Sequence, residues 1–211
     1  ILLPIFAFIL ALLLTRPGQP NSGLRAAFFL PHVISMVILG EVWRFIYVQV
    51  LPALSESLSI GLLDQPWLTS DSLAIYSIAF AAVWRGVGFH MLIFIAGIEA
   101  IPKEVIESAA LDGATGLKKD WYVVLPNMLP AATVSLFLTL IGSLKVFPIV
   151  MVMTGGGPGR ATVVAVLDLY NTTFNAGQFG YGSAKAIVLL IIILVIGLTQ
   201  LSVMKKREVE Y

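Results

Sequence analysis

The chain has 211 residues, of which 58% are hydrophobic and 12% charged, with 13 Lys and Arg against 12 Asp and Glu. Soluble domains carry roughly 25% charged residues, so this composition excludes a disordered chain and indicates a polytopic membrane protein. The net charge of +1 gives no sign of a nucleic-acid partner. There is no cysteine, and His32 and His90 are far apart, so we expect no metal site and no cofactor.

Five apolar runs predict membrane-spanning helices, because about 20 apolar residues cross the hydrocarbon core of a bilayer. The first run, residues 1–14, is shorter than this and does not begin with Met. We therefore expect a partial span in an N-terminally truncated chain. The other spans are predicted at 26–50, 73–98, 129–153 and 183–203. The span at 73–98 should be interrupted at 84–88, where two glycines weaken the helix and Arg85 lies at membrane depth.

The cations of the connecting segments predict the orientation of the chain. The turn after residue 14, the segment 99–127 and the C-terminal tail together hold eight of the 13 Lys and Arg, whereas the alternate loops hold only Arg160. By the positive-inside rule, the segment 99–127 and the C-terminus are cytoplasmic. The segment 51–72, a loop with one short interfacial helix, and the Gly-rich segment 154–181 then face outside.

The segment 99–127 is the most charged part of the molecule. Pro102 followed by Lys103 and Glu104 predicts the start of a helix, and Gly113 can end or bend it. We expect a helix, a bend and a second helix that form a docking knob outside the membrane. By composition alone, a plain connecting loop fits equally well.

The spacing within this segment resembles the EAA loop of bacterial ABC importer permeases. That pattern is E-A-A, three residues, G, nine residues, I-x-L-P, and here Glu107 to Gly113 is followed by nine residues and then Val123 to Pro126. Ser108 stands in place of the first Ala, and Val123 in place of Ile. Other stretches are similar to the sugar-type permeases, in particular the first permease of maltose or glycerol-3-phosphate importers: Phe28–Pro31, Trp84–Phe89, Ile101–Glu104, Leu111–Ala114, Lys145–Phe147 and Thr154–Gly159.

The resemblance implies a type I ABC importer permease fold, with residues 1–211 forming a single all-α transmembrane domain in the bacterial inner membrane. It also implies a second permease subunit, two cytoplasmic ATPase subunits and an extracytoplasmic solute-binding protein, which together move a sugar, an oligosaccharide or a glycerol-phosphate-like solute. The chain has no G-x-x-x-x-G-K-[ST] sequence, so ATP hydrolysis falls to the partner ATPases. The resemblance assigns the coupling to the ATPase to Glu107, Ser108, Ala109, Ala110, Asp112, Gly113, Leu125 and Pro126.

Lys145 is predicted in the middle of the span 129–153, and an ionisable residue at membrane depth indicates a functional site. We expect it to lie on the translocation pathway with Gly142 and Phe147; a structural cation paired with a neighbouring span is the alternative. Arg85 has the same two interpretations, and its place beside two glycines slightly favours the structural one.

Three other interpretations of the sequence can be compared with its motifs. The run from Gly155 to Arg160 is like a phosphate-binding loop but lacks the Lys-Ser/Thr ending, so a re-entrant segment or one facing the binding protein fits better. The spans contain no G-x-S-x-G sequence, no His pair and no paired Asp. They therefore lack the nucleophile or metal ligands that an intramembrane hydrolase would need. An ion-coupled carrier or channel remains the alternative function, in which the EAA-like spacing is coincidence.

Overall fold

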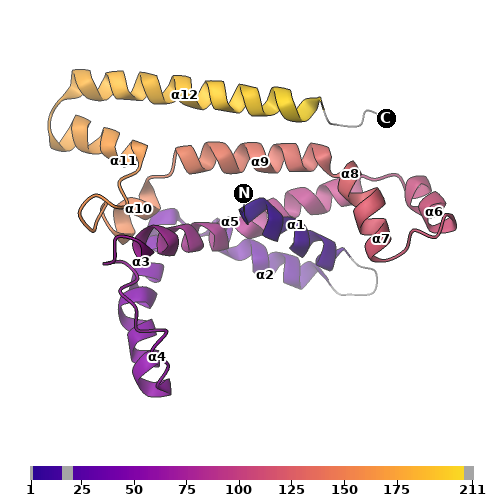
Figure 1. Cartoon of the computed structure of the whole chain (residues 1–211), viewed down its shortest axis with the longest axis horizontal. Helices are drawn as coiled ribbons and strands as arrows, with labels where there is room; N and C mark the ends of the chain where they lie inside the picture. The colour runs from indigo at the N-terminus through magenta and orange to yellow at the C-terminus, as the bar shows by residue number, and fades with distance from the viewer. Residues whose placement is uncertain (1, 16–20, 207–211) are drawn as a thin grey trace. The chain divides into compact units, whose positions relative to one another are not determined.

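The computed structural model describes residues 2–15 and 21–206, which are helical with no β-strand, as predicted for an all-α chain (Figure 1). Residue 1 of the first predicted span and residues 207–211 of the predicted cytoplasmic tail lie outside the described residues. The α-helices are α1 Leu2–Leu14, α2 Asn21–Val33, α3 Met36–Phe45, α4 Leu51–Leu58, α5 Leu73–Glu99, α6 Lys103–Leu111, α7 Leu117–Lys119, α8 Leu125–Asn127, α9 Leu129–Leu144, α10 Pro148–Met153, α11 Ala165–Tyr170 and α12 Phe179–Lys205, with π-helical turns at Ile46–Val50, Asp120–Val124 and Asn171–Asn175.

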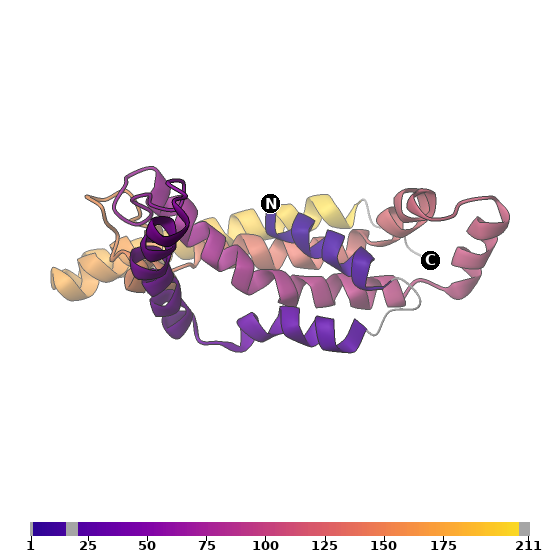
Figure 2. The same ribbon diagram turned by 90° about the horizontal axis from the view of Figure 1, so that it is seen from below.

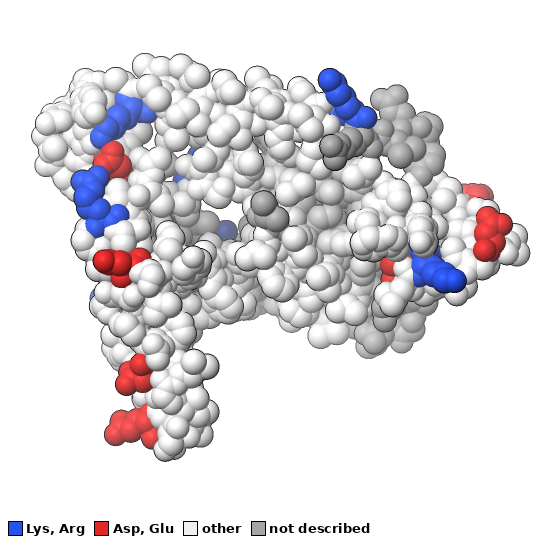
Figure 3. Space-filling view, viewed as in Figure 1, with Lys and Arg blue, Asp and Glu red and all other residues white. Residues whose placement is uncertain are grey.

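Within these described ranges, three helices are long and apolar enough to cross a membrane. They are α5, α12 and Met36–Leu58, which joins α3, a π-helical turn and α4. The helix α9 qualifies only together with Leu117–Asn127, from which it is bent by 67°. The most apolar stretch of α12 has a mean hydropathy of 2.8, yet only 6% of this stretch is buried within the chain. Figure 3 shows the strip over α12 as white, with Lys and Arg atoms only towards its ends.

The helix predicted at 26–50 is two helices, and the second runs on to Leu58. The break falls at Ile34 and Ser35 and is visible in Figure 2. Pro31 weakens the last turn of α2 because it has no N–H to donate. Ser35 has the extended ψ of 138° that is common just before a helix. The extension past residue 50 follows from the π-helical turn before Pro52, since a wider turn accommodates a ring that an α-helix interior would not.

The predicted interruption at 84–88 is wrong: α5 is continuous from Leu73 to Glu99. The glycines in it serve close packing instead. A side chain at Gly88 would collide with the backbone carbonyl of Phe28 in α2, and one at Gly86 would crowd Leu3 in α1. Glycine costs helix stability, but here it lets α1 and α2 approach α5.

The chain divides into two compact units. The first comprises residues 1–32, 86–141 and 194–211. A buried hydrogen bond of 2.9 Å joins His90 Nδ1 of α5 to Ser135 Oγ of α9, and the His32 ring stacks on Phe89. Both histidines therefore contribute to helix packing. The buried core of this unit joins α1, α5 and the base of α6–α8 through Ala7, Ala11, Leu14, Met91, Phe94, Ile95, Ile101, Val124 and Met128.

The second unit comprises residues 33–85 and 142–193. The predicted span 129–153 ends as a regular helix at Leu144, and α10 restarts at Pro148, whose fixed φ suits a first helical turn. Because Gly40 has no side chain, α3 packs closely against Val152 of α10. The core of the unit contains Leu39, Tyr47, Ile78, Ala81, Ile149, Val150, Met153 and Leu167.

Candidate functional site

The EAA-like segment begins with α6, which starts after Pro102 and carries Glu104 in its first turn. The helix ends in a Schellman motif. The Ala114 N–H donates to the Ala109 carbonyl at 2.8 Å, and the Gly113 N–H donates to the Ala110 carbonyl at 3.1 Å. Gly113 has the left-handed φ of +81° that this motif requires, which glycine adopts without strain. The Gly of the sequence pattern is therefore the residue that ends the helix.

A second helix follows at once and returns the chain to α9. It runs from Leu117 to Asn127 through a π-helical turn that precedes Pro126, and α9 leaves it at an angle of 67°. Val124 and Met128 fix this corner, since they are 2% and 1% exposed in the unit core. The structure thus has a helix, a bend and a helix, and Figures 1 and 2 show α6 and α7 beyond the end of α5.

The two halves of the EAA-like pattern meet on this knob, because α6 contacts the π-helical turn Asp120–Val124. Ala109 is half-buried, and the other seven residues of the predicted coupling set are exposed. The same segment carries four large apolar side chains that are exposed: Leu111 is 90% exposed, Leu117 77%, Trp121 67% and Tyr122 73%. We call these four the apolar rim. Exposed apolar groups gathered in this way are typical of an interaction surface.

Two features mark the place where the knob meets the helices of its unit. A hollow of about 360 Å³ lies at its base, with walls from the end of α5, from Pro102 and from Pro126. Beside it, Arg25 Nη1 of α2 donates to Glu99 Oε1, the last residue of α5, at 2.9 Å. Arg25 Nη2 also donates to the carbonyl of Leu14 at 3.3 Å. The sequence gives no sign of this ion pair, because its two partners are 74 residues apart.

Three of the four predicted pathway residues lie at a break between helices or just before it. Lys145 is exposed in the turn between α9 and α10, and is thus outside the helix in which it was predicted. A side chain at Gly142 would meet nothing within 4 Å, and the Phe147 ring lies 5.2 Å from Tyr170. These three share one short stretch of the second unit. Arg85 is elsewhere, with its Nε donating to the Ile34 carbonyl at 3.3 Å, where it supports the break between α2 and α3.

An ion-pair cluster that sequence reasoning missed joins the Gly-rich segment to α12. Asp168 of α11 accepts from Lys185 Nζ at 2.6 Å and from Arg160 at 3.0 Å. Lys185 also donates to Thr172 Oγ1 at 2.7 Å. The hydrogen bond from Lys185, helped by Arg160, lowers the pKa of Asp168 below its ordinary value. A signal was present: Asp168 is the only acidic residue between Trp121 and Lys206.

The first part of the Gly-rich segment, residues 154–163, is held together by its own hydroxyl groups. The hydroxyls of Thr154 and Thr162 lie 2.7 Å apart, and Thr162 donates to the Gly157 carbonyl at 2.7 Å. Gly156 has a φ of +97° beside Leu167, a backbone that a side chain would strain. These contacts fold the first part of the segment on itself, and we call residues 154–175 the Gly-rich cap. Within the described part of the chain, no three His, Asp or Glu side chains gather as a metal site would require.

Comparisons with known proteins show the family of this chain. Residues 1–207 match the family described as binding-protein-dependent transport system inner membrane component. The chain is 39% identical over 201 residues to the probable starch degradation products transport system permease protein AmyD of Thermoanaerobacterium thermosulfurigenes, covering 95% of this chain and 68% of AmyD. It is 32% identical to the multiple sugar-binding transport system permease protein MsmF of Streptococcus mutans, covering 97% of this chain and 71% of MsmF.

The fold has a solved counterpart. A bacterial ABC transporter that imports the acidic polysaccharide alginate contains a chain that superposes with a TM-score of 0.83 at 23% identity, over 95% of this chain and 72% of that one. This likeness supports the ABC importer permease fold. With the family match over nearly the whole sequence, it settles the classification: the chain belongs to the family of binding-protein-dependent transport system inner membrane components.

Proposed function

We propose that this chain is the membrane-spanning permease subunit of an ATP-driven importer that receives a sugar, an oligosaccharide or a glycerol-phosphate-like solute from an extracytoplasmic binding protein. The names of AmyD and MsmF favour the sugars within this set. Membership of a binding-protein-dependent family favours an importer over an ion-coupled carrier or channel. The observation that carries the proposal is the knob of α6–α8, which brings both halves of the EAA-like pattern to one exposed surface.

The division of labour places ATP hydrolysis on partner subunits. The chain has no P-loop sequence with which to bind ATP phosphates. In this proposal a second permease completes the membrane channel, and each permease binds one of two cytoplasmic ATPase subunits. The positive-inside rule then puts the knob and the C-terminus in the cytoplasm, where the ATPases are.

The knob has the physical properties of a docking element. Complete burial of a large apolar side chain stabilises a contact by about 1.5–3 kcal/mol, so a few residues of the apolar rim suffice to hold a partner. Val124, Met128 and Ile101 are buried in the same core as α1 and α5. A partner that moves the knob therefore pulls on packed helices, in the manner of a rigid-body or hinge transition.

Gly113 gives the sharpest test of this coupling role. A side chain there would meet nothing within 4 Å of its own chain, so any steric effect must come from a partner or from the left-handed backbone. We expect Gly113→Asp to lower solute uptake at least about tenfold in reconstituted vesicles, a loss of about 1.4 kcal/mol, while the subunit still inserts and assembles. Gly177→Asp is the matched control, because Gly177 has a φ of +67° and equally open surroundings.

The control separates the two causes of a loss in the Gly113 variant. Backbone strain alone would affect both variants similarly, whereas contact with the ATPase affects only Gly113→Asp. Normal uptake and normal ATPase stimulation in that variant would contradict the coupling role of this segment.

We also propose that Gly142, Lys145 and Phe147 line the translocation pathway, whereas Arg85 has a structural role through the Ile34 carbonyl. A break between helices exposes backbone groups, which are tolerated at membrane depth only beside protein or a water-filled cavity. Lys145→Ala is expected to change uptake rate or solute preference several-fold without loss of assembly, measured against a panel of labelled sugars. If only the yield of assembled complex falls, Lys145 is a structural cation.

A further inference from the structure

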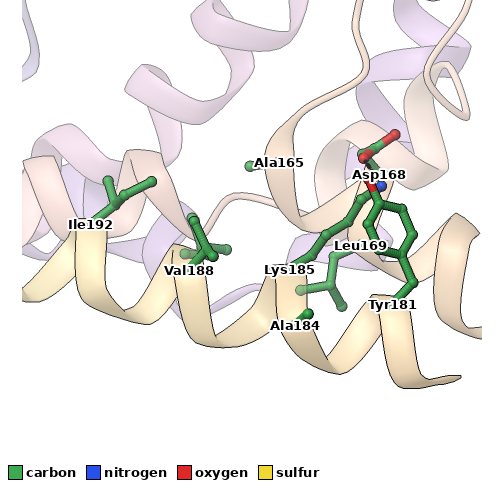
Figure 4. Close-up of a pocket in the computed structure, with 9 residues that line it drawn as sticks. Ala165, Asp168, Leu169, Tyr181, Ala184, Lys185, Val188 and Ile192 are labelled. Carbon is green, nitrogen blue, oxygen red and sulfur yellow. Dashed lines mark hydrogen bonds and ion pairs between the residues drawn. The ribbon is translucent and has the colours of Figure 1, made fainter.

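A groove of about 400 Å³ lies between α11 and α12 in the second unit (Figure 4). Its long wall is one face of α12, formed by Ala184, Val188 and Ile192 at intervals of four residues. From Tyr181 to Ile192 the helix rises about 16 Å. The other wall comes from α11, including Leu169. The groove is therefore elongated and mostly apolar.

One end of the groove is polar and, together with Arg160 beside it, carries more positive than negative charge. Lys185 binds Asp168 and lies 4.7 Å from the centre of the Tyr181 ring. Arg160 binds the other oxygen of Asp168 through one nitrogen, and its side chain is 78% exposed. A guanidinium has five N–H donors in a fixed fork, so Arg160 can bind an anion outside the cluster. Two cations and one carboxylate leave a net charge of +1 at this end.

The groove opens on a surface that the chain itself leaves uncovered. Its wall residue Val188 is 56% exposed, and α12 as a whole is long and apolar enough to span a bilayer. A sugar does not fit such a wall, because it would leave hydroxyl groups buried against apolar side chains. A ligand with a phosphate at one end and an acyl chain along the other fits both parts.

We propose that this groove binds a phospholipid, with its phosphate at Arg160 and Lys185 and one acyl chain along Ala184, Val188 and Ile192. The bound lipid would cover the exposed face of α12 and fasten α11 to it at the membrane surface. The proposal does not depend on the solute or on the coupling knob, so it stands or fails separately from the proposed function.

Native mass spectrometry of the purified, delipidated importer complex with phosphatidylglycerol added back tests the site. We expect the wild type to retain one phospholipid more per copy of this chain than either of two variants. Arg160→Gln removes the guanidinium that binds the lipid phosphate, and Val188→Trp fills the groove. The matched controls are Arg44→Gln, which removes another exposed ion-paired cation, and Ile187→Trp, which places the same bulk on a neighbouring exposed position of α12 outside the groove. Both controls should retain lipid as the wild type does.

Equal lipid retention in all five proteins would overturn the proposal. Arg160→Gln keeps the test valid if the tryptophan variant fails to assemble. A photoreactive residue at Val188 adds a second measurement: cross-linking to phospholipid supports the site, and cross-linking to the second permease shows that a protein helix occupies the groove instead. Inorganic phosphate is tested in the same way. Retention of phosphate by the wild type and equally by Val188→Trp, without retention of phospholipid, would show an anion site without an acyl-chain site.

Discussion

Residues 103–127 and 154–175 both connect apolar helices, and they place their side chains in opposite ways. The first segment exposes the apolar rim and carries the EAA-like residues on its surface. The second ties its polar groups to one another, through Thr154 and Thr162 and through Asp168 with its two cations. An exposed apolar surface is unsatisfied in the isolated chain, whereas the polar groups of the second segment have partners within the chain.

The difference indicates where partners act. The knob gains stability only when another surface covers it, so its residues should matter for transport more than for folding. The Gly-rich cap and its ion pairs stabilise the subunit itself, so their residues should matter for folding first. Three substitutions or conditions test this contrast.

Trp121→Ala should have the largest effect, on transport rather than stability. Large aromatic residues often dominate interface energies, with losses of about 2 kcal/mol or more on truncation. We expect ATPase binding to weaken at least about tenfold and uptake to fall accordingly. The melting temperature of the isolated subunit should change little, because Trp121 is 67% exposed. A large drop in melting temperature with unchanged ATPase binding would show that Trp121 serves folding and not the contact with the ATPase.

Asp168→Asn should act in the opposite sense, on stability before transport. It removes the carboxylate that two cations share, at a position where the side chains are 28% to 78% exposed. Discounting for this exposure, we expect a loss of about 1 kcal/mol, or about 2–4 °C in melting temperature for a chain of this size. The double variant with Lys185→Met should recover part of the loss, because it removes the cation left unpaired. An unchanged melting temperature would show that the ion-pair cluster does not stabilise the subunit.

The pH dependence of the same carboxyl should give the smallest effect. Its pKa is lowered in the folded chain, so the stabilisation is present above the ordinary value of 3.8 and is lost as pH falls through the lowered value. Melting temperatures of the wild type and of Asp168→Asn should therefore differ above about pH 4 and converge below it. Parallel curves down to strongly acid pH would show that the ion pairs contribute nothing.

The sequence predicted the all-α class and the helix, bend and helix of the knob, because Pro102, Gly113 and Pro126 are local signals. A glycine or proline acts on its own segment, so its effect can be read without the fold. The EAA-like spacing is also local, and it pointed to the family that the comparisons show.

What the sequence could not supply depends on residues far apart in the chain. Two glycines in α5 suggested a break, but their role is set by Phe28 and Leu3, more than 50 residues away. Arg85 supports a break in a different helix, at Ile34. The Arg25–Glu99 ion pair joins partners whose proximity only the packing of α2 on α5 creates. Such contacts have no periodic or spacing signal.

Site-specific cross-linking from the knob tests whether the knob contacts an ATPase subunit. The chain contains no cysteine, so Trp121→Cys introduces a single thiol into this subunit, which can carry a photoreactive group. Phe179→Cys, at a position 63% exposed on α12, is the matched control. In the assembled importer, we predict that the group at residue 121 cross-links to an ATPase subunit and the group at residue 179 does not. Cross-linking of residue 121 only to lipid or to the second permease would contradict a role of the knob in binding the ATPase.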